Sequence, residues 1–435
     1  MRSRFYVCLA IGVFTISTRA IAQDSSWQSV VLRGDSAVLE RRFADALPLY
    51  EQALKLAGDD AGKEALTLQN LAMTYYGQGD FRQAEAHYIQ AIEQWNRMVS
   101  PPASLMAVTY SNMGDLMTDI HRFETAVEMH QRALELRKKA DPPNVSRVAL
   151  AMSKLASSLN LNGNPGEAEE MAKAAWAMMR ASPGADSLDL ASVLDALAQI
   201  YSSQRKFALA EPLFHESLQI LERVSGDHDP AYALGLQNLA ILHHMAGRSE
   251  RAEPLLRKAA LVYETVMGPR HPYLTTIWNE QGVIALESKK YSVAIAYMQK
   301  SYDLSVEAFG PGHLRTVLAQ ANLALTYARL GRPEKAKGIM EAVVAAERES
   351  STISPVEFAR TLSNCGQLFF DLKEWKKAAG FFEEALPIWK ELPEQYEWEM
   401  ARALQGYAHV LRASHNPDAH RVEKEAKTFL ETHRR

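Results

Sequence analysis

The feature that most constrains this chain is a 42-residue pattern that recurs along it. Its clearest copy runs from Ala231 to Met267, and Tyr273 opens the next copy. On either side of a short turn at Gly247, apolar residues stand at three- and four-residue spacing. This spacing predicts two amphipathic helices packed as a hairpin. Because one hairpin cannot bury its apolar face alone, successive copies must stack on one another.

The phase of the pattern is set by the residue that opens each second helix, which we call the anchor. The first interval between anchors is 38 residues and the next eight are 42. The predicted anchors are Phe43, Phe81, Phe123, Pro165, Phe207, Ser249, Tyr291, Pro333, Trp375 and Pro417. Proline, which ends helices, stands in the connections between units: Pro101, Pro142, Pro183, Pro230, Pro272, Pro311, Pro355 and Pro393.

The same phase governs the residues where the two helices would cross. For the eight anchors from Phe81 to Trp375, alanine stands three residues later and alanine or glycine nine residues earlier. Seven residues after these anchors the side chain is mostly large and apolar. Small residues at a crossing, with a large side chain filling the next gap, are what close-packed hairpins need. The sequence therefore predicts an all-α array of about ten helix-turn-helix units.

One unit carries the spacing of a known family. This unit contains Leu71, Ala72, Tyr75, Gly79, Phe81, Ala84, Tyr88 and Ala91, and it resembles the tetratricopeptide repeat. The 42-residue period and the Gly268-Pro269-Arg270-His271-Pro272 linker resemble the kinesin-light-chain type of that repeat. The resemblance covers about residues 24 to 432. It implies an α-solenoid, wound as a right-handed superhelix, that recruits peptides or protein segments.

The repeat also sets the expected domain organisation. We divide the chain into a signal peptide (1–22), an N-terminal capping repeat (23–66), tandem repeats (67–393) and a C-terminal repeat with its cap (394–435). Arg33, Gly34 and Asp35 interrupt the apolar rhythm of the first unit, as expected of a cap. With 47% hydrophobic and 23% charged residues, the composition is that of an ordinary globular protein. The uninterrupted repeat favours one elongated array over separate compact domains.

The N-terminus has the features of a secretory signal. Two arginines, Arg2 and Arg4, precede a 12-residue apolar run, and Ala20-Ile21-Ala22 follows as a cleavage site. The run is shorter than the roughly 20 residues that span a bilayer. We therefore expect cleavage after Ala22 and export to the periplasm or the medium. If residues 1–22 are not a signal, the protein would be intracellular.

Charge and cysteine content exclude several classes of partner and site. Removal of residues 1–22 leaves 45 Lys and Arg against 52 Asp and Glu, a formal charge of −7. A mildly acidic chain has no basic footprint for nucleic acid and no polybasic segment for membrane insertion or anionic lipid. Only Cys365 remains, so an intramolecular disulfide is impossible, and a buried structural thiol is expected.

No sequence motif predicts catalysis, a metal or a cofactor. His215-Glu216 lacks the second histidine of a zinc-protease motif, and Gly77-Gln78-Gly79 lacks the third glycine of a dinucleotide loop. Adjacent helical residues such as His243 and His244 diverge by about 100° and cannot face one ion. Asp229 is better explained as the start of a helix. We therefore predict a protein that is not an enzyme.

The candidate binding residues lie on the first helix of each unit, twelve and eleven residues before the anchor. Their spacing places them away from the stripe that meets the second helix, and the family resemblance implies that they line a concave groove. The position eleven before the anchor holds Asn70, Asn112, Asn238, Asn322 and Asn364, interrupted by Lys154, Ala196, Glu280 and Gly406. The neighbouring position contributes Gln69, Gln237, Asn279 and Gln405.

Five recurrences of asparagine at one helical position need a cause, because asparagine is less favourable there than alanine by roughly 0.6 kcal/mol. An amide matches both the C=O and the N–H of a peptide unit. We therefore predict a ladder that binds an extended ligand, in two segments around Asn70 and Asn112 and around Asn322 and Asn364. In the alternative, each amide bonds a neighbouring repeat and braces the array.

These patterns together predict an exported, non-enzymatic scaffold that binds an extended segment of another protein on its concave face. One alternative is a structural subunit of the cell envelope that docks through its flank or ends. Another, if the signal peptide is absent, is an intracellular peptide-sensing regulator.

Overall fold

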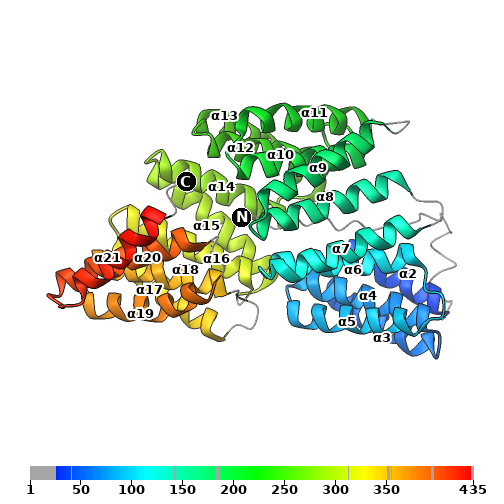
Figure 1. Ribbon diagram of the computed structural model, residues 1–435, viewed down its shortest axis with the longest axis horizontal. Coiled ribbons are helices and arrows are strands. Elements are labelled where there is room, and N and C mark those ends of the chain that lie inside the picture. The colour runs from blue at the N-terminus through cyan, green and yellow to red at the C-terminus, as the bar shows by residue number, and fades with distance from the viewer. Residues whose placement is uncertain are drawn as a thin grey trace. The chain divides into compact units, whose positions relative to one another are not determined.

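The computed structural model describes residues 26–40, 42–140, 144–181, 187–311, 313–349, 353, 355–392 and 396–432. Within these ranges the chain forms twenty α-helices and no strand (Figure 1). None of these helices is both long and apolar enough to cross a membrane. The predicted signal peptide and Pro142, Pro183 and Pro393 lie outside the described residues. The all-α prediction is confirmed.

The helices pack as consecutive pairs, each a hairpin of a first and a second helix. The first helices are α2 (Trp27–Leu39), α4 (Ala61–Gln78), α6 (Ala103–Asp119), α8 (Val145–Leu161), α10 (Leu188–Ser203), α12 (Pro230–Met245), α14 (Tyr273–Glu287), α16 (Leu314–Arg329), α18 (Pro355–Asp371) and α20 (Glu397–Ala413). The second helices are α3 (Phe43–Ala57), α5 (Phe81–Arg97), α7 (Phe123–Lys139), α9 (Pro165–Arg180), α11 (Phe207–Ser225), α13 (Ser249–Met267), α15 (Tyr291–Phe309), α17 (Pro333–Glu349), α19 (Trp375–Glu391) and α21 (Ala419–Thr432). Helices α2–α9 belong to one compact unit and α10–α21 to another.

Nine of the ten second helices begin at their predicted anchor. The exception is α21, which begins at Ala419 and not at Pro417. The side-chain oxygen of Asn416 accepts a hydrogen bond from the backbone N–H of Asp418 at 2.9 Å. This contact holds residues 417 and 418 in a turn, so the helix starts two residues late.

Small residues allow the two helices of each hairpin to approach closely. The eight alanines three residues after the anchors from Phe81 to Trp375 are all 0% exposed: Ala84, Ala126, Ala168, Ala210, Ala252, Ala294, Ala336 and Ala378. A Cβ added to Gly366 would lie 2.6 Å from the ring of Phe382, which stands sixteen residues later across the hairpin. The pairs Gly114 with His130 and Gly282 with Met298 repeat this contact.

The first hairpin follows the same rule, which corrects the interpretation of Gly34 as an interruption. Gly34 lies nine residues before Phe43, and a Cβ there would come within 2.6 Å of the Tyr50 ring. The Tyr50 hydroxyl donates to Asp35 Oδ1 at 2.6 Å. Gly34 is therefore the small crossing residue of this hairpin, and Asp35 satisfies the buried end of the tyrosine.

Each of the nine hairpin turns from α4–α5 to α20–α21 contains one residue with positive φ, two positions before the predicted anchor. Gly247 fills this position with φ 72°, so the turn predicted there is confirmed. Four turns use glycine: Gly79, Gly163, Gly247 and Gly331. The other five use larger residues in the left-handed region: His121, Arg205, Lys289, Lys373 and His415. The repeat geometry is thus strong enough to hold non-glycine residues in a conformation that costs roughly 1–2 kcal/mol.

Two further predictions about individual side chains are confirmed. Asp229 caps α12, because its carboxylate accepts from the backbone N–H of Ala231 at 2.7 Å. Cys365 is fully buried in α18, and burial raises the pKa of its thiol well above the ordinary range. The thiol is therefore a packing group held in its neutral form.

The close helix crossing predicts opposite effects for two glycine-to-alanine changes. Gly366→Ala should destabilise the protein by about 1–3 kcal/mol, because the new methyl group overlaps the Phe382 ring. Gly380→Ala, in the exposed part of α19, meets nothing within 4 Å and should stabilise by about 0.5–1 kcal/mol. Urea denaturation of both variants provides the measurement. If the two variants change the free energy of unfolding equally, the helix crossing at Gly366 can accommodate a methyl group, which would contradict this account.

Candidate protein-binding face

The first helices form the face on which the predicted binding residues lie. Within each unit the first helix of one hairpin contacts the first helix of the next, as α4 contacts α6 and α12 contacts α14. We call the residues twelve, eleven and eight positions before the anchors on these helices the first-helix face. Stacking of the hairpins brings these positions together across successive repeats.

Three of the five predicted asparagines donate hydrogen bonds to the preceding repeat. Asn322 Nδ2 bonds Asn279 Oδ1 at 2.8 Å, and Asn238 Nδ2 bonds Asp195 Oδ2 at 3.4 Å. In the first unit, Asn70 Nδ2 bonds Asp35 Oδ1 at 3.2 Å. These are the contacts expected of bracing. An amide has two N–H donors and a carbonyl oxygen, so each bonded asparagine retains capacity for a ligand, and the ligand ladder stays a prediction.

The other predicted residues differ in their exposure. Asn112 and Asn364 are half-buried, as is Asn279. Gln405 is exposed. Gln69 and Gln237 are 8% and 6% exposed, and Gln69 Oε1 accepts a hydrogen bond from Thr109 Oγ1 of the next hairpin at 2.6 Å. The side chain twelve residues before the anchor is therefore buried in some repeats and exposed to solvent in others.

Acidic residues complete the face, and the sequence pattern did not single them out. Asp35 and Asp115 stand eight residues before their anchors, and Asp195 stands twelve before. Lys154 interrupts the run of asparagines but makes the equivalent contact, with its Nζ 2.5 Å from Asp115 Oδ2. The sequence could have predicted this contact from opposite charges: an acid stands eight residues before one anchor and a cation eleven residues before the next. The two residues are 39 apart in the chain, and a search for the same residue type at the same repeat position does not connect them.

Asp115 is the best-defined charge on this face. Burial acts to raise the pKa of its carboxyl, but the Lys154 ammonium and the His130 ring outweigh burial and lower the pKa to about 2. His130 Nε2 lies 3.3 Å from Asp115 Oδ1, and its Nδ1 lies 2.7 Å from Ser158 Oγ. The ionised carboxylate thereby links α6, α7 and α8 through polar contacts.

The part of the chain that the structure describes has no group of three or more His, Cys, Asp or Glu placed to hold a metal ion. His243 Nε2 is 4.0 Å from Glu211 Oε1, whereas His244 Nδ1 is 3.6 Å from Glu287 Oε2. The adjacent histidines therefore have different partners, as their helical positions require.

The repeats match a family model described as the tetratricopeptide repeat. The matched segments are residues 30–97, 64–139, 147–214, 203–265 and 273–349, well over half of the chain. The chain belongs to the tetratricopeptide repeat family. Its helical hairpins, close crossings and first-helix contacts are the structural form of these repeats in this chain.

Among relatives, this tetratricopeptide repeat protein is similar to Protein KINESIN LIGHT CHAIN-RELATED 2 of Arabidopsis thaliana. The two are 21% identical over 325 residues, covering 72% of this chain and 48% of the relative. Protein KINESIN LIGHT CHAIN-RELATED 3 of the same plant is also 21% identical, over 79% of this chain and 54% of its own. The chain spans about half the length of these curated relatives. The similarity supports the kinesin-light-chain-like type of repeat.

Solved structures share the tetratricopeptide fold over most of the chain. A Rap protein complexed with Competence and Sporulation Factor aligns with a TM-score of 0.56 and 12% identity, covering 85% of this chain and 99% of that protein. The apo form of the quorum sensor NprR from B. thuringiensis aligns with a TM-score of 0.52 and 13% identity, covering 85% and 100%. At this identity the likeness shows the fold alone.

The Lys154–Asp115 contact predicts a pH-dependent loss of stability. Lys154→Met should destabilise the tetratricopeptide array by about 1.5–3 kcal/mol at pH 7, because it leaves a partly buried carboxylate without its cation. The contribution of a depressed Asp pKa is complete above the ordinary value of 3.8 and disappears as pH falls through about 2. The difference in unfolding free energy between variant and parent should shrink over that range.

Arg132→Met supplies the control, because the Arg132–Glu135 pair is exposed and should contribute less than about 1 kcal/mol. Urea denaturation at a series of pH values measures both variants. A cost for Lys154→Met that is small at pH 7, or constant down to pH 2, would contradict this account of Asp115.

Proposed function

We propose that this protein is a non-enzymatic scaffold that binds an extended segment of another protein along its first-helix face. The observation that carries the proposal is the recurrence of asparagine at one position in five repeats, on the face where polar groups of neighbouring hairpins meet. Three of these amides are already oriented by a bond to the preceding repeat. Side chains oriented in this way lose less freedom when a peptide binds.

We further propose two binding segments. Asn70 and Asn112 lie on α4 and α6 of the first compact unit, and Asn322 and Asn364 lie on α16 and α18 of the second. The first unit adds Asp35 and the Asp115–Lys154 pair to its face, so its ligand should carry hydrogen-bond donors. The polar amides of the second unit favour backbone recognition with little choice of side chain.

The observed inter-repeat bonds also favour a second candidate, in which the amides only brace the array. A braced solenoid without a peptide groove would serve as a structural assembly subunit that docks through its flank or ends. The two candidates differ at Asn112 and Asn364, because these two amides make no side-chain hydrogen bond within the described residues, whereas Asn238 and Asn322 do.

Two double variants separate binding from bracing. Asn112→Ala with Asn364→Ala should weaken partner binding about 10- to 30-fold, at about 1 kcal/mol for each lost bond, and should not lower the melting temperature, because alanine is the better helix former. Asn238→Ala with Asn322→Ala should lower the melting temperature as well. A partner captured from cell-envelope extract by the parent protein serves for titration calorimetry. If both variants keep the parent's affinity and only the second loses stability, the amides brace the array and do not bind the partner.

We also propose that the scaffold acts outside the cytoplasm, on the evidence of the N-terminal sequence. The protein isolated from its native cells should begin at Gln23 and fractionate with the periplasm or the medium. Replacing Ala20 and Ala22 by leucine removes the small residues that signal cleavage requires and should leave the precursor uncut. Intact mass and N-terminal sequencing measure both. A cytoplasmic protein that retains residues 1–22 would favour the peptide-sensing regulator.

A further inference from the structure

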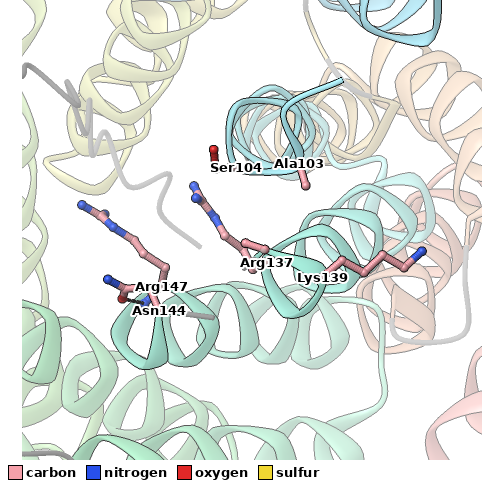
Figure 2. Close-up of a pocket in the computed structure, with 7 residues that line it drawn as sticks. Ala103, Ser104, Arg137, Lys139, Asn144 and Arg147 are labelled. Atoms are coloured by element: carbon pink, nitrogen blue, oxygen red, sulfur yellow. Dashed lines mark hydrogen bonds between the residues drawn. The ribbon is translucent and has the colours of Figure 1, made fainter. Parts of the chain in front are cut away.

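A basic cleft lies in the first compact unit, where Ser104 and Arg147 stand two helical turns before the first-helix-face residues Ser111 and Lys154. It has a volume of about 400 Å³ and is formed where α6 begins, α7 ends and α8 begins. Ser104, Arg137, Lys139, Asn144 and Arg147 contribute to its lining. In Figure 2 the side chains of Arg137 and Arg147 extend in the same direction from neighbouring helices, whereas Lys139 points the other way. The cleft therefore presents two guanidinium groups.

Arg137 departs from the packing rule of the repeat. It stands fourteen residues after its anchor, Phe123. At the same position the other repeats from α5 to α19 place residues that are each at most 4% exposed: Trp95, Met179, Leu221, Tyr263, Ser305, Glu347 and Trp389. Arg137 is thus a half-buried cation at a position that is fully buried in those repeats. Such a substitution weakens the packing between repeats, so a chain that keeps it is expected to gain something else from it.

The two arginines have no neutralising acid in the described part of the chain. Among the described residues, no Asp or Glu lines the cleft, and neither Arg137 nor Arg147 forms an ion pair. Other second-helix contacts pair their cations, as Arg122 does with Glu85 at 2.5 Å. Burial, and then the charge of Arg147, lower the pKa of Arg137. Two like charges held together around a half-enclosed space favour a bound anion.

We propose that this cleft binds an oxyanion of the phosphate class, either inorganic phosphate or the phosphate group of a monoester. A guanidinium offers paired N–H donors in a fixed plane, and two of them from different helices can each contact a separate edge of a tetrahedral anion. The Ser104 hydroxyl, on the opposite helix, is a further donor. Asn144 already uses its side-chain oxygen to accept from the backbone N–H of Arg147 at 3.0 Å.

The size of the cleft favours a monoester over the free ion. About 400 Å³ lies in the range of small-molecule sites and exceeds the space that one phosphate group fills. The uncharged side of the ligand would then rest against Ala103 and Ala140 at the rim. This binding site is independent of the protein-binding function proposed above.

The test titrates the full chain with inorganic phosphate, O-phosphoserine and acetate at constant ionic strength, by calorimetry and by melting temperature. Phosphate and phosphoserine should bind saturably and raise the melting temperature, whereas acetate should not. Arg147→Gln, at an exposed site, should weaken phosphate binding at least tenfold. Arg82→Gln removes the same charge from an exposed position on α5 of the same unit and should bind as the parent does.

Arg137→Met tests separately how much Arg137 reduces the stability of the protein. It places an apolar residue, as Met179 is in the next repeat, at a position that other repeats bury, so it should raise the melting temperature in phosphate-free buffer and abolish the response to phosphate. Tighter binding of phosphoserine than of phosphate assigns the site to a monoester, and equal binding assigns it to the free ion. Absence of saturable binding to the parent chain, or equal phosphate affinity in Arg147→Gln and Arg82→Gln, overturns the proposal.

Discussion

The close crossing of the two helices in each hairpin is the contact on which the rest of the structure depends. Glycine or alanine nine residues before the anchor lies under the side chain seven residues after it, as Gly366 lies under Phe382. The fully buried alanines three residues after the anchors complete the crossing. Because the same small residues recur in each repeat, the hairpins within each compact unit present the same faces to their neighbours.

This packing leaves one face of every first helix for polar contacts between repeats. On it, Asn322 bonds Asn279 and Lys154 reaches Asp115, so different residue types perform the same bridging task. Bracing and ligand binding can therefore share one surface. The amides that already bond a neighbour link successive repeats and keep one N–H and the carbonyl oxygen available, while Asn112 and Asn364 have no side-chain bond within the described residues.

Residues that differ from the repeat pattern can serve a function that stacking of the hairpins does not require. Arg137 stands at a position that the other repeats from α5 to α19 bury, and it lines a cleft with Arg147. By contrast, Lys289 and its counterparts with positive φ depart from glycine without creating any site, because the hairpin imposes the turn on whatever residue stands there. A departure is informative when it brings together chemical groups that the repeat alone does not require.

The sequence by itself determined the hairpins, their phase and the first residue of nine second helices, because helix formation and helix crossing follow from local spacing. It also determined the buried state of Cys365, through its phase in the repeat, and the cap at Asp229, which depends on near neighbours in the chain. Only the tertiary structure decided which polar groups meet across repeats, such as Asn322 with Asn279 and Lys154 with Asp115. It also decided that Arg137 and Arg147 line one cleft. The physical reason is that such contacts depend on the offset and angle between stacked hairpins, to which many residues contribute and which a repeat period does not specify.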